Sequence, residues 1–203
     1  MNRLVAVLIF TGMGIAPSFA QSDCTLRKDQ DSIKVYTCHT DTSKFKSISA
    51  EFTLDATLDQ VENFFLDFSG YVNWQYNTVQ SSLIKKTANS EYIYYTIIDA
   101  PWPITDRDMV VLLRLDHLEN GFTITANSVA NVIARNKEYI RVPTSHSQYI
   151  FKKKNGHQLS VSYRMQINPG GSVPVWLVNL VCAQAPYLSF KKMKERVSKK
   201  NKP

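Results

Sequence analysis

The chain has 203 residues, of which 44% are hydrophobic and 20% are charged, and its formal net charge is +7. These proportions are those of a globular protein and exclude a disordered chain. After residue 20, no segment reaches the run of about 18 apolar residues that a membrane-spanning helix requires, which excludes an integral membrane protein. The length fits one domain of ordinary size.

The first twenty residues have the pattern of a signal peptide. Arg3 supplies a positive charge, Leu4–Ile15 form a short apolar segment, and Ser18-Phe19-Ala20 has the small residues that signal peptidase recognises. We therefore predict cleavage after Ala20, export to the periplasm or the outside of the cell, and one mature domain over residues 21–203. An uncleaved membrane anchor is the alternative, although two glycines and a proline weaken a continuous helix there.

Three cysteines allow at most one disulfide within the chain. Cys24 and Cys38 flank a segment in which Asp29-Gln30-Asp31-Ser32 predicts a turn between two short strands. In an exported protein these two cysteines are the natural pair, and closing a loop of this length would stabilise the fold by about 3 kcal/mol. Cys182 lies in an apolar helical segment and is expected to be a buried free thiol.

Alternating and β-branched patterns predict about seven further strands, followed by one long helix, which is an α+β fold. The strand patterns cover residues 44–54, 79–86, 91–99, 108–118, 121–129, 147–153 and 158–167. Asn155-Gly156 predicts a hairpin between the last two strands. After the first of these strands, the apolar spacing that starts at Leu58 predicts a short amphipathic helix.

The C-terminal helix is expected to begin at Ser172 as N-cap, with Pro174 in the first turn. Pro186 falls inside the helical pattern and is expected to kink the helix. Apolar or large side chains recur at intervals of three and four, and only the sheet can cover such a stripe. The stripe contains Trp176, Leu177, Leu180, Val181, Gln184, Tyr187 and Leu188.

The sequence contains no recognisable catalytic or cofactor motif. Its few glycines do not form a dinucleotide or phosphate-binding loop, and its four histidines are scattered without the spacing of metal ligands. We therefore expect no catalytic residue, no cofactor, no metal and no nucleic-acid partner.

One segment, Asp99–Val111, is unusual because two prolines flank Trp102 and force an extended connection between two strands. Asp106 and Asp108 would share one face of the following strand, and Arg107 would point to the other face. If the acids face solvent, Arg107 faces the interior. A buried arginine is costly unless it is paired, so it needs either a carboxylate from another strand or an anionic ligand group. Both alternatives remain open from the sequence.

Several stretches together resemble the START domains, lipid-transfer modules of the helix-grip superfamily, and especially their exported bacterial members. They are Ile33-Lys-Val-Tyr, Asn73-Trp74, Tyr94-Tyr95, Ala100-Pro-Trp-Pro-Ile-Thr-Asp-Arg-Asp-Met-Val, Pro169-Gly-Gly and Pro174-Val-Trp-Leu-Val-Asn179. The resemblance implies a curved antiparallel sheet wrapped around the long C-terminal helix, with an internal hydrophobic tunnel for one ligand. It also implies that the loop at residues 131–142 covers the tunnel, whereas an ordinary connection between strands is the alternative.

With this fold, the ligand-binding residues are expected to be Tyr94, Trp102 and Arg107 together with the helix stripe of Trp176, Leu177, Leu180, Val181, Gln184, Tyr187 and Leu188. We expect a monomer that binds a lipid or another hydrophobic molecule and carries it between membranes of the cell envelope. The alternatives are a helix-grip enzyme of the cyclase or hydrolase type and a non-transferring envelope partner. Basic residues near the C-terminus, with Lys191, Lys192 and Lys194 foremost, are expected either to contact anionic membranes or simply to be solvated.

Overall fold

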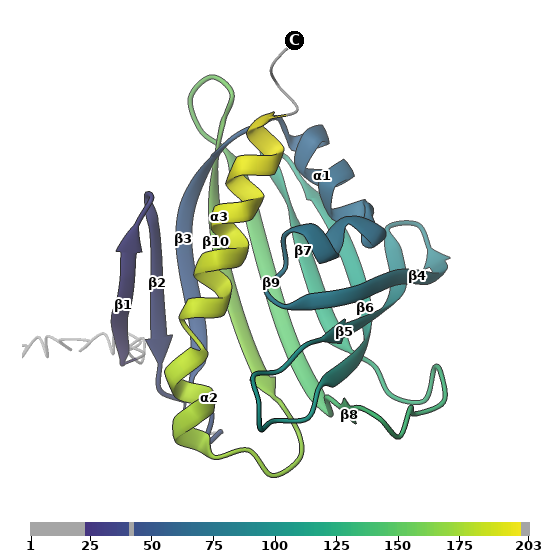
Figure 1. Cartoon of the computed structure of the whole chain (residues 1–203). Coiled ribbons are helices and arrows are strands. Elements are labelled where there is room, and N and C mark those ends of the chain that lie inside the picture. Colours follow the sequence, from purple (N-terminus) through teal and green to yellow (C-terminus); the bar gives the residue numbers. More distant parts are fainter. Residues whose placement is uncertain (1–22, 41–42, 200–203) are drawn as a thin grey trace, which may run out of the picture.

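The structure, a computed structural model, describes residues 23–40 and 43–199. The expected signal peptide and its cleavage site lie outside these residues. Within them the chain forms a curved sheet of ten strands with helices on one face (Figure 1). The strands are β1 (Cys24–Gln30), β2 (Ile33–Cys38), β3 (Ser47–Asp55), β4 (Thr78–Ala88), β5 (Glu91–Ile98), β6 (Arg107–Leu118), β7 (Gly121–Ser128), β8 (Ile140–Arg141), β9 (Thr144–Lys153) and β10 (Gln158–Asn168).

The strand order is β1-β2-β3-β10-β9-β7-β6-β5-β4, and these neighbours are antiparallel. The short strand β8 lies off this path and pairs in parallel with β6. Strand β10 therefore joins the N-terminal strands to the rest of the sheet. Its residue Tyr163 lies opposite Ala50 of β3 on one side and opposite Tyr149 of β9 on the other.

All of the strands expected from the sequence are present, and β8 is the one addition among the described residues. The expected disulfide is also present: Cys24 and Cys38 are bonded and lie opposite each other in the β1–β2 ladder. The short helix α1 (Leu58–Leu66) begins with Thr57 as N-cap, whose side chain accepts a hydrogen bond from the Gln60 backbone. The Gln60 side chain accepts one from the Thr57 backbone in return, which completes a capping box.

The C-terminal helix differs from the prediction in two places. Pro174, not Ser172, is the N-cap of helix α2 (Val175–Val181), and no side-chain hydrogen bond caps this helix. Instead of a kink at Pro186, the helix is interrupted at Cys182 and Ala183, and α3 (Gln184–Lys199) follows. Proline lacks the N–H that would bond to the carbonyl four residues earlier, so the break precedes Pro186, which then fits the first turn of α3.

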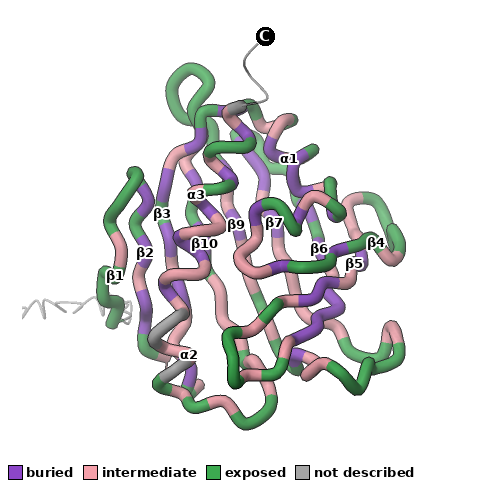
Figure 2. The backbone as a smooth tube through the Cα atoms, viewed as in Figure 1, coloured by how far each residue is buried: buried purple, intermediate pink, exposed green. Residues whose placement is uncertain are grey.

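The core lies between the inner face of the sheet and the helices (Figure 2). Alternate residues of β3 point inward, and Phe52 stacks on Phe190 of α3 with ring centroids 4.8 Å apart. Helix α1 and the short 3-10 helix η1 (Phe68–Asn73) cover the neighbouring part of the same face with Phe65 and Tyr71. No helix of the described residues is both long enough and apolar enough to cross a membrane.

Candidate functional site

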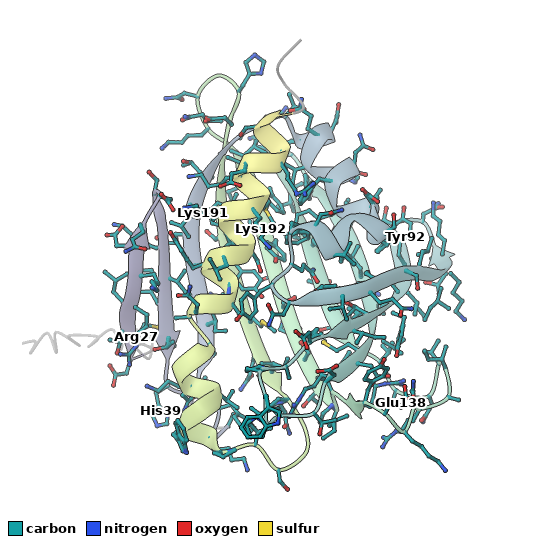
Figure 3. All side chains as sticks on the ribbon, viewed as in Figure 1. Arg27, His39, Tyr92, Glu138, Lys191 and Lys192 are labelled. Carbon is teal, nitrogen blue, oxygen red and sulfur yellow. A yellow bond between two sulfur atoms is a disulfide. The ribbon has the colours of Figure 1, made fainter. Side chains whose placement is uncertain are left out.

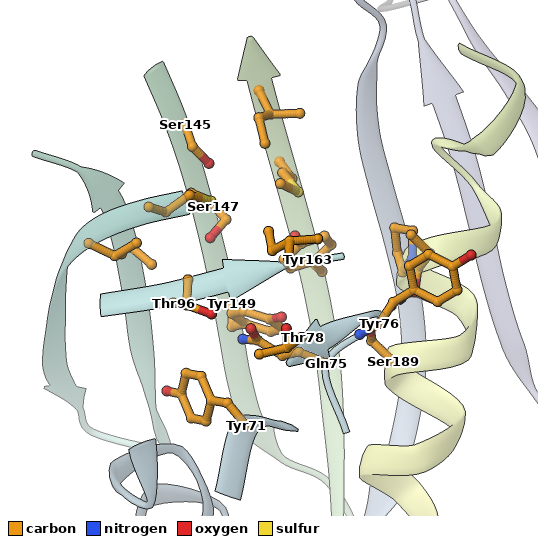
Figure 4. A pocket seen from close by; sticks show the side chains of 18 of the residues that line it. Tyr71, Gln75, Tyr76, Thr78, Thr96, Ser145, Ser147, Tyr149, Tyr163 and Ser189 are labelled. Atoms are coloured by element: carbon orange, nitrogen blue, oxygen red, sulfur yellow. Dashed lines mark hydrogen bonds between the residues drawn. The ribbon is translucent and has the colours of Figure 1, made fainter. Parts of the chain in front are cut away.

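A cavity of about 290 Å³ lies between the inner face of the sheet and the α2–α3 segment (Figure 4). One wall comes from alternate residues of β6, namely Met109, Val111 and Leu113, and from Ile124 and Ala126 of β7. Since alternate residues of a strand point to one face, a run of hydrophobic side chains in these two strands makes that wall apolar.

The helical wall is formed around the break between α2 and α3. Val178, Cys182, Pro186 and Phe190 contribute side chains to it. Ser189 ties α3 to the opposite side of the cavity, because its hydroxyl accepts a 2.9 Å hydrogen bond from the backbone N–H of Tyr76. Cys182 is a half-buried free thiol, and burial raises its pKa.

Four buried tyrosines are among the polar residues of the cavity. Tyr71 is committed to the backbone, because its hydroxyl donates a 2.6 Å hydrogen bond to the Phe65 carbonyl. Tyr94 and Gln75 both line the cavity, and the ring centroids of Tyr149 and Tyr163 lie 4.5 Å apart. Burial raises the pKa of the tyrosines Tyr71, Tyr94, Tyr149 and Tyr163.

The cavity is more exposed at one end than at the other. Phe65, Tyr71 and Tyr94 are buried, whereas Ser145 at the start of β9 and Ile167 at the end of β10 are only half-buried. In Figure 1 this second end is the lower one, where β10 leads into the connection to α2. A ligand therefore has the shortest path from solvent into the cavity at the lower end.

None of the lining side chains that the structure describes is charged. Nor do residues 23–40 and 43–199 contain a group of three or more His, Cys, Asp or Glu side chains that could hold a metal ion. The described cavity thus offers hydrocarbon, hydroxyl and amide groups, and it is suited to holding an apolar molecule with few polar atoms.

Of the expected ligand-binding residues, Tyr94 lines the cavity and most others do not. Trp102 is 92% exposed and Trp176 is 68% exposed. The side chains of Leu177, Leu180 and Val181 lie outside the described residues. Gln184, Tyr187 and Leu188 belong to α3 but do not line the cavity. The expected stripe assumed one continuous helix, and the break at Cys182 and Ala183 ends the regular spacing on which it relied.

Arg107 is buried, but it is not a lining residue of the cavity. Its guanidinium donates a hydrogen bond to the Thr105 carbonyl, and burial lowers its pKa. Among the described residues no carboxylate forms a salt bridge with Arg107, so the alternative of a carboxylate from another strand is not observed, and the alternative of an anionic ligand group stays a prediction.

The condition that both acids face solvent is not met, because Asp108 is completely buried although Arg107 is buried too. Its carboxylate accepts hydrogen bonds of 2.9 and 2.8 Å from Arg141 and one of 3.1 Å from the Tyr95 hydroxyl. Burial and the bond to Asp108 raise the pKa of Tyr95 to about 12. The carboxylate is buried because β8, which carries Arg141, pairs with β6 beside it.

The segment at residues 131–142, expected either to cover the tunnel or to be an ordinary connection, contributes no lining residue to the cavity. Its last part is held to the sheet by the β8 pairing and by the Arg141–Asp108 ion pair. The structure therefore places the end of this segment along the edge of β6, at the start of that strand.

The expected membrane-contacting lysines have different surroundings (Figure 3). Lys191 lies 3.0 Å from the Asp31 carboxylate, and the Lys194 ammonium donates a 2.8 Å hydrogen bond to the Asp31 carbonyl. Lys192 is exposed. Two of the three lysines therefore attach α3 to the β1–β2 turn.

The sequence interpretation missed Gln75, Ser145, Ser147, Tyr149 and Tyr163 as lining residues. A signal for two of them was available. The hairpin predicted at Asn155-Gly156 fixes the register of β9 and β10, and it places Tyr149 opposite Tyr163 on the inner face. Gln75 could not be found in this way, because it lies in an irregular turn after η1.

Comparison with known proteins gives the same fold and a family. The family model described as START domain matches residues 22–202. The protein PA1579 of Pseudomonas aeruginosa is 28% identical over 197 residues, which cover 97% of each chain. A crystal structure of a STAR-related lipid transfer protein from Xanthomonas axonopodis has 27% identity and a TM-score of 0.81, covering 87% of this chain and 99% of that one.

Human STARD10 has 19% identity and a TM-score of 0.78, covering 87% of this chain and 74% of that chain. The chain belongs to the START domain family, since the family model matches nearly its full length. A more distant structure, the Zhui aromatase/cyclase of Streptomyces sp. R1128, has 10% identity and a TM-score of 0.52, covering 74% of this chain and 90% of that chain. The fold alone thus occurs in both lipid-transfer proteins and enzymes.

Proposed function

We propose that the protein binds a lipid or another hydrophobic molecule in the cavity between the sheet and α3, and carries it between membranes of the cell envelope. The observation that supports this most directly is the apolar cavity itself, whose described lining has no charged side chain. Membership of the START domain family and the likeness to a STAR-related lipid transfer protein support the same function.

The energetics favour a carrier that works without a chemical step. Each methylene group that leaves water for an apolar site gains about 0.8 kcal/mol, so an alkyl chain crosses water on its own only slowly. A cavity lined by hydrocarbon offsets most of this cost during the passage. The protein then only has to shield the chain and exchange it at each membrane.

Catalysis is the competing function, because a cyclase shares the fold. The described lining contains no Asp, Glu, His, Lys or Arg side chain that could act as a general acid or base at neutral pH. Its tyrosines have raised pKa values, which keeps them protonated and unsuited to act as bases. These features favour binding over catalysis.

An exported location is consistent with the Cys24–Cys38 disulfide, because such bonds persist in oxidising compartments. We propose that the protein is exported through the N-terminal signal sequence and meets membranes with the end that carries α2 and the β5–β6 connection. Trp102 and Trp176 are exposed on these two elements, which lie at the lower end of the molecule in Figure 1. Exposed tryptophans favour the membrane–water interface.

Mass spectrometry of protein isolated gently from its own cells tests the function directly. Under non-denaturing conditions, we expect a mass above that of the polypeptide, which falls to the polypeptide mass after extraction with organic solvent. The extract should contain a hydrophobic molecule that rebinds the delipidated protein. A protein that carries no such molecule and takes up none from vesicles would contradict the proposal.

A further inference from the structure

The two exposed tryptophans that we assign to the membrane contact belong to separate parts of the chain. Trp102 lies in the connection between β5 and β6, whereas Trp176 lies in α2, after the last strand. A lipid surface takes up both side chains at once only when their spacing is fixed beforehand, because two loosely joined anchors lose binding free energy when they are ordered. Such a contact therefore requires a support that holds both elements.

Strand β8 holds the element that carries Trp102. The backbone N–H of Ile140 donates a 2.9 Å hydrogen bond to the carbonyl of Asp106, just before β6 begins. The carboxylate of Asp106 accepts a 3.0 Å hydrogen bond from the backbone N–H of Ala100, which closes the connection around Trp102. One end of β8 is therefore bonded to the residue at which this connection is closed.

The side chain of Ile140 lies against the turn that leads from β10 to α2. Gly170 and Gly171 belong to this turn, and both have positive φ values, of 71° and 64°. A Cβ atom at Gly171 would lie 2.7 Å from Cδ1 of Ile140, and one at Gly170 would lie 3.3 Å from Cγ2 of the same side chain. The turn packs this closely only because neither residue has a side chain. Ile140 thus contacts both elements, one through its backbone and the other through its side chain.

A buried ion pair keeps β8 from shifting along β6. Arg141, the residue after Ile140, donates hydrogen bonds of 2.9 and 2.8 Å to the carboxylate of Asp108, to which the Tyr95 hydroxyl also donates. Moving β8 would separate two charges that are almost completely buried, which is strongly unfavourable. Helix α2, in contrast, has no side-chain cap among the described residues. The turn against Ile140 is therefore a fixed point from which α2 starts.

We propose that Ile140 is a positioning residue that fixes the spacing between Trp102 and Trp176, so that both reach a lipid bilayer as one docking surface. This inference rests on the proposed membrane contact and adds the support that organises it. A bilayer is the partner that two exposed indoles favour, since tryptophan is enriched at membrane–water interfaces. Figure 1 shows β8, the β5–β6 connection and α2 at the same lower end of the molecule.

Co-sedimentation of the protein with phosphatidylcholine vesicles tests the role of Ile140, because a lipid without net charge reports the apolar contact alone. Ile140→Ala removes the side chain that touches Gly171 and keeps the backbone hydrogen bond to Asp106. We expect it to weaken vesicle binding about threefold, as much as Trp176→Ser alone. In the Trp176→Ser background, Ile140→Ala should cause no further loss, since only one anchor is left to position.

A loss from Ile140→Ala that is the same with and without Trp176 would overturn the positioning role, because Ile140 would then act on the fold alone. Ile133→Ala is the matched control, since Ile133 is a half-buried isoleucine in the same segment, and it should leave vesicle binding unchanged. If the wild-type protein does not bind vesicles, or if neither tryptophan contributes to binding, the proposed membrane contact is wrong and the inference about Ile140 falls with it.

A second set of variants tests the contact from the side of the turn. Gly171→Ala places a methyl group against Cδ1 of Ile140 and should weaken vesicle binding about threefold. Adding Ile140→Val removes Cδ1 and should restore part of this loss. Gly156→Ala is the matched control, because Gly156 has a similar φ of 63° but a Cβ there meets no described atom within 4 Å.

Equal effects of Gly171→Ala and Gly156→Ala on vesicle binding, or no recovery with Ile140→Val, would contradict the role of this contact. Thermal unfolding of each variant, measured beside the wild type, shows that the protein is folded at the temperature of the binding experiment.

Discussion

The hydroxyl of Tyr187 on α3 donates a 2.6 Å hydrogen bond to the carboxylate of Asp31, 156 residues earlier in the chain. Asp31 lies in the β1–β2 turn with a positive φ of 53°. Lys191 and Lys194 contact the same residue, and the Lys28 ammonium lies 5.7 Å from the centre of the Tyr187 ring. The N-terminal hairpin therefore holds the helix that covers the cavity.

Asp31→Asn should weaken this attachment and lower the melting temperature at neutral pH. The hydrogen bond from Tyr187, followed by the one from Lys191, lowers the pKa of Asp31. A carboxyl group whose pKa is lower in the folded state stabilises the fold above its unfolded pKa of about 3.9, and this contribution disappears as the pH falls through the folded value. Wild type and variant should therefore differ at pH 7 and converge in strong acid, which thermal unfolding across pH measures.

Asp29→Asn is the matched control, because Asp29 is an exposed acid in the same hairpin with no contact to α3 among the described residues. It should leave the melting temperature nearly unchanged at every pH. A difference between wild type and Asp31→Asn that persists below the folded pKa would show that the carboxylate charge is not its cause.

The rate at which the Cys182 thiol is chemically labelled should show whether a molecule occupies the cavity. Its thiol lines the cavity, and burial raises its pKa, so it stays protonated at neutral pH and reacts slowly with iodoacetamide. We expect the labelling rate to rise with pH and to fall when 1-decanol or another bound molecule fills the cavity. Intact mass should show one label, since Cys24 and Cys38 are bonded. Labelling at the rate of the unfolded chain, or a rate that does not respond to any bound molecule, would contradict this placement.

Arg141→Met should destabilise the protein by about 3 kcal/mol, because it leaves the carboxylate of Asp108 buried without its cation. Urea unfolding measures the change. The double variant Asp108→Asn, Arg141→Met should recover part of the loss, since the unpaired charge is then removed. Arg135→Met, at an exposed position of the same segment, is the control and should have little effect. Equal losses of unfolding free energy in Arg141→Met and Arg135→Met would show that the Arg141–Asp108 ion pair does not stabilise the fold.

The proposed membrane contact predicts that Trp102→Ser with Trp176→Ser lowers binding to lipid vesicles by about tenfold. The loss should be similar at low and physiological salt, because the contact is mainly apolar. Val79→Ser is the control, since Val79 is 59% exposed on β4, away from both tryptophans in sequence. Vesicle co-sedimentation at several salt concentrations makes the comparison.

The same experiment with Lys192→Glu tests the basic end of α3. An electrostatic contact to anionic vesicles is screened over about 8 Å at physiological salt, so its loss should be largest at low salt. If Lys192→Glu abolishes binding and the tryptophan variant does not, the membrane contact lies along α3 and not at the lower end of the molecule, contrary to the proposal.

Local patterns in the sequence were sufficient to predict most of the fold. Alternation along each strand, the turn at Asp31 and Ser32, and the hairpin at Asn155-Gly156 all act over a few residues, so their signals are visible in the sequence. The disulfide could be expected for the same reason, because Cys24 and Cys38 are brought together by a single turn.

The site required information that a local pattern does not carry. The break at Cys182 and Ala183 decides which face α3 presents to the cavity. A helical pattern read without this break does not identify that face. Tyr187 fitted the apolar stripe, yet its partner is Asp31 at the far end of the chain. Asp108 is buried because β8 brings Arg141 beside it, and the sequence pattern around Asp108 does not show this partner. In each case a distant segment decides where the side chain lies.

The place of β10 between β3 and β9 has a consequence for the order of folding. Strand β3 is made early and has β2 as its partner, but its other edge stays open until β10, one of the last strands, has been synthesised. Helix α3, which the hairpin β1–β2 holds in place, follows later still. A nascent chain therefore cannot close the wall of its cavity or cover it before it is nearly complete, and its slowest step should be this pairing of distant strands.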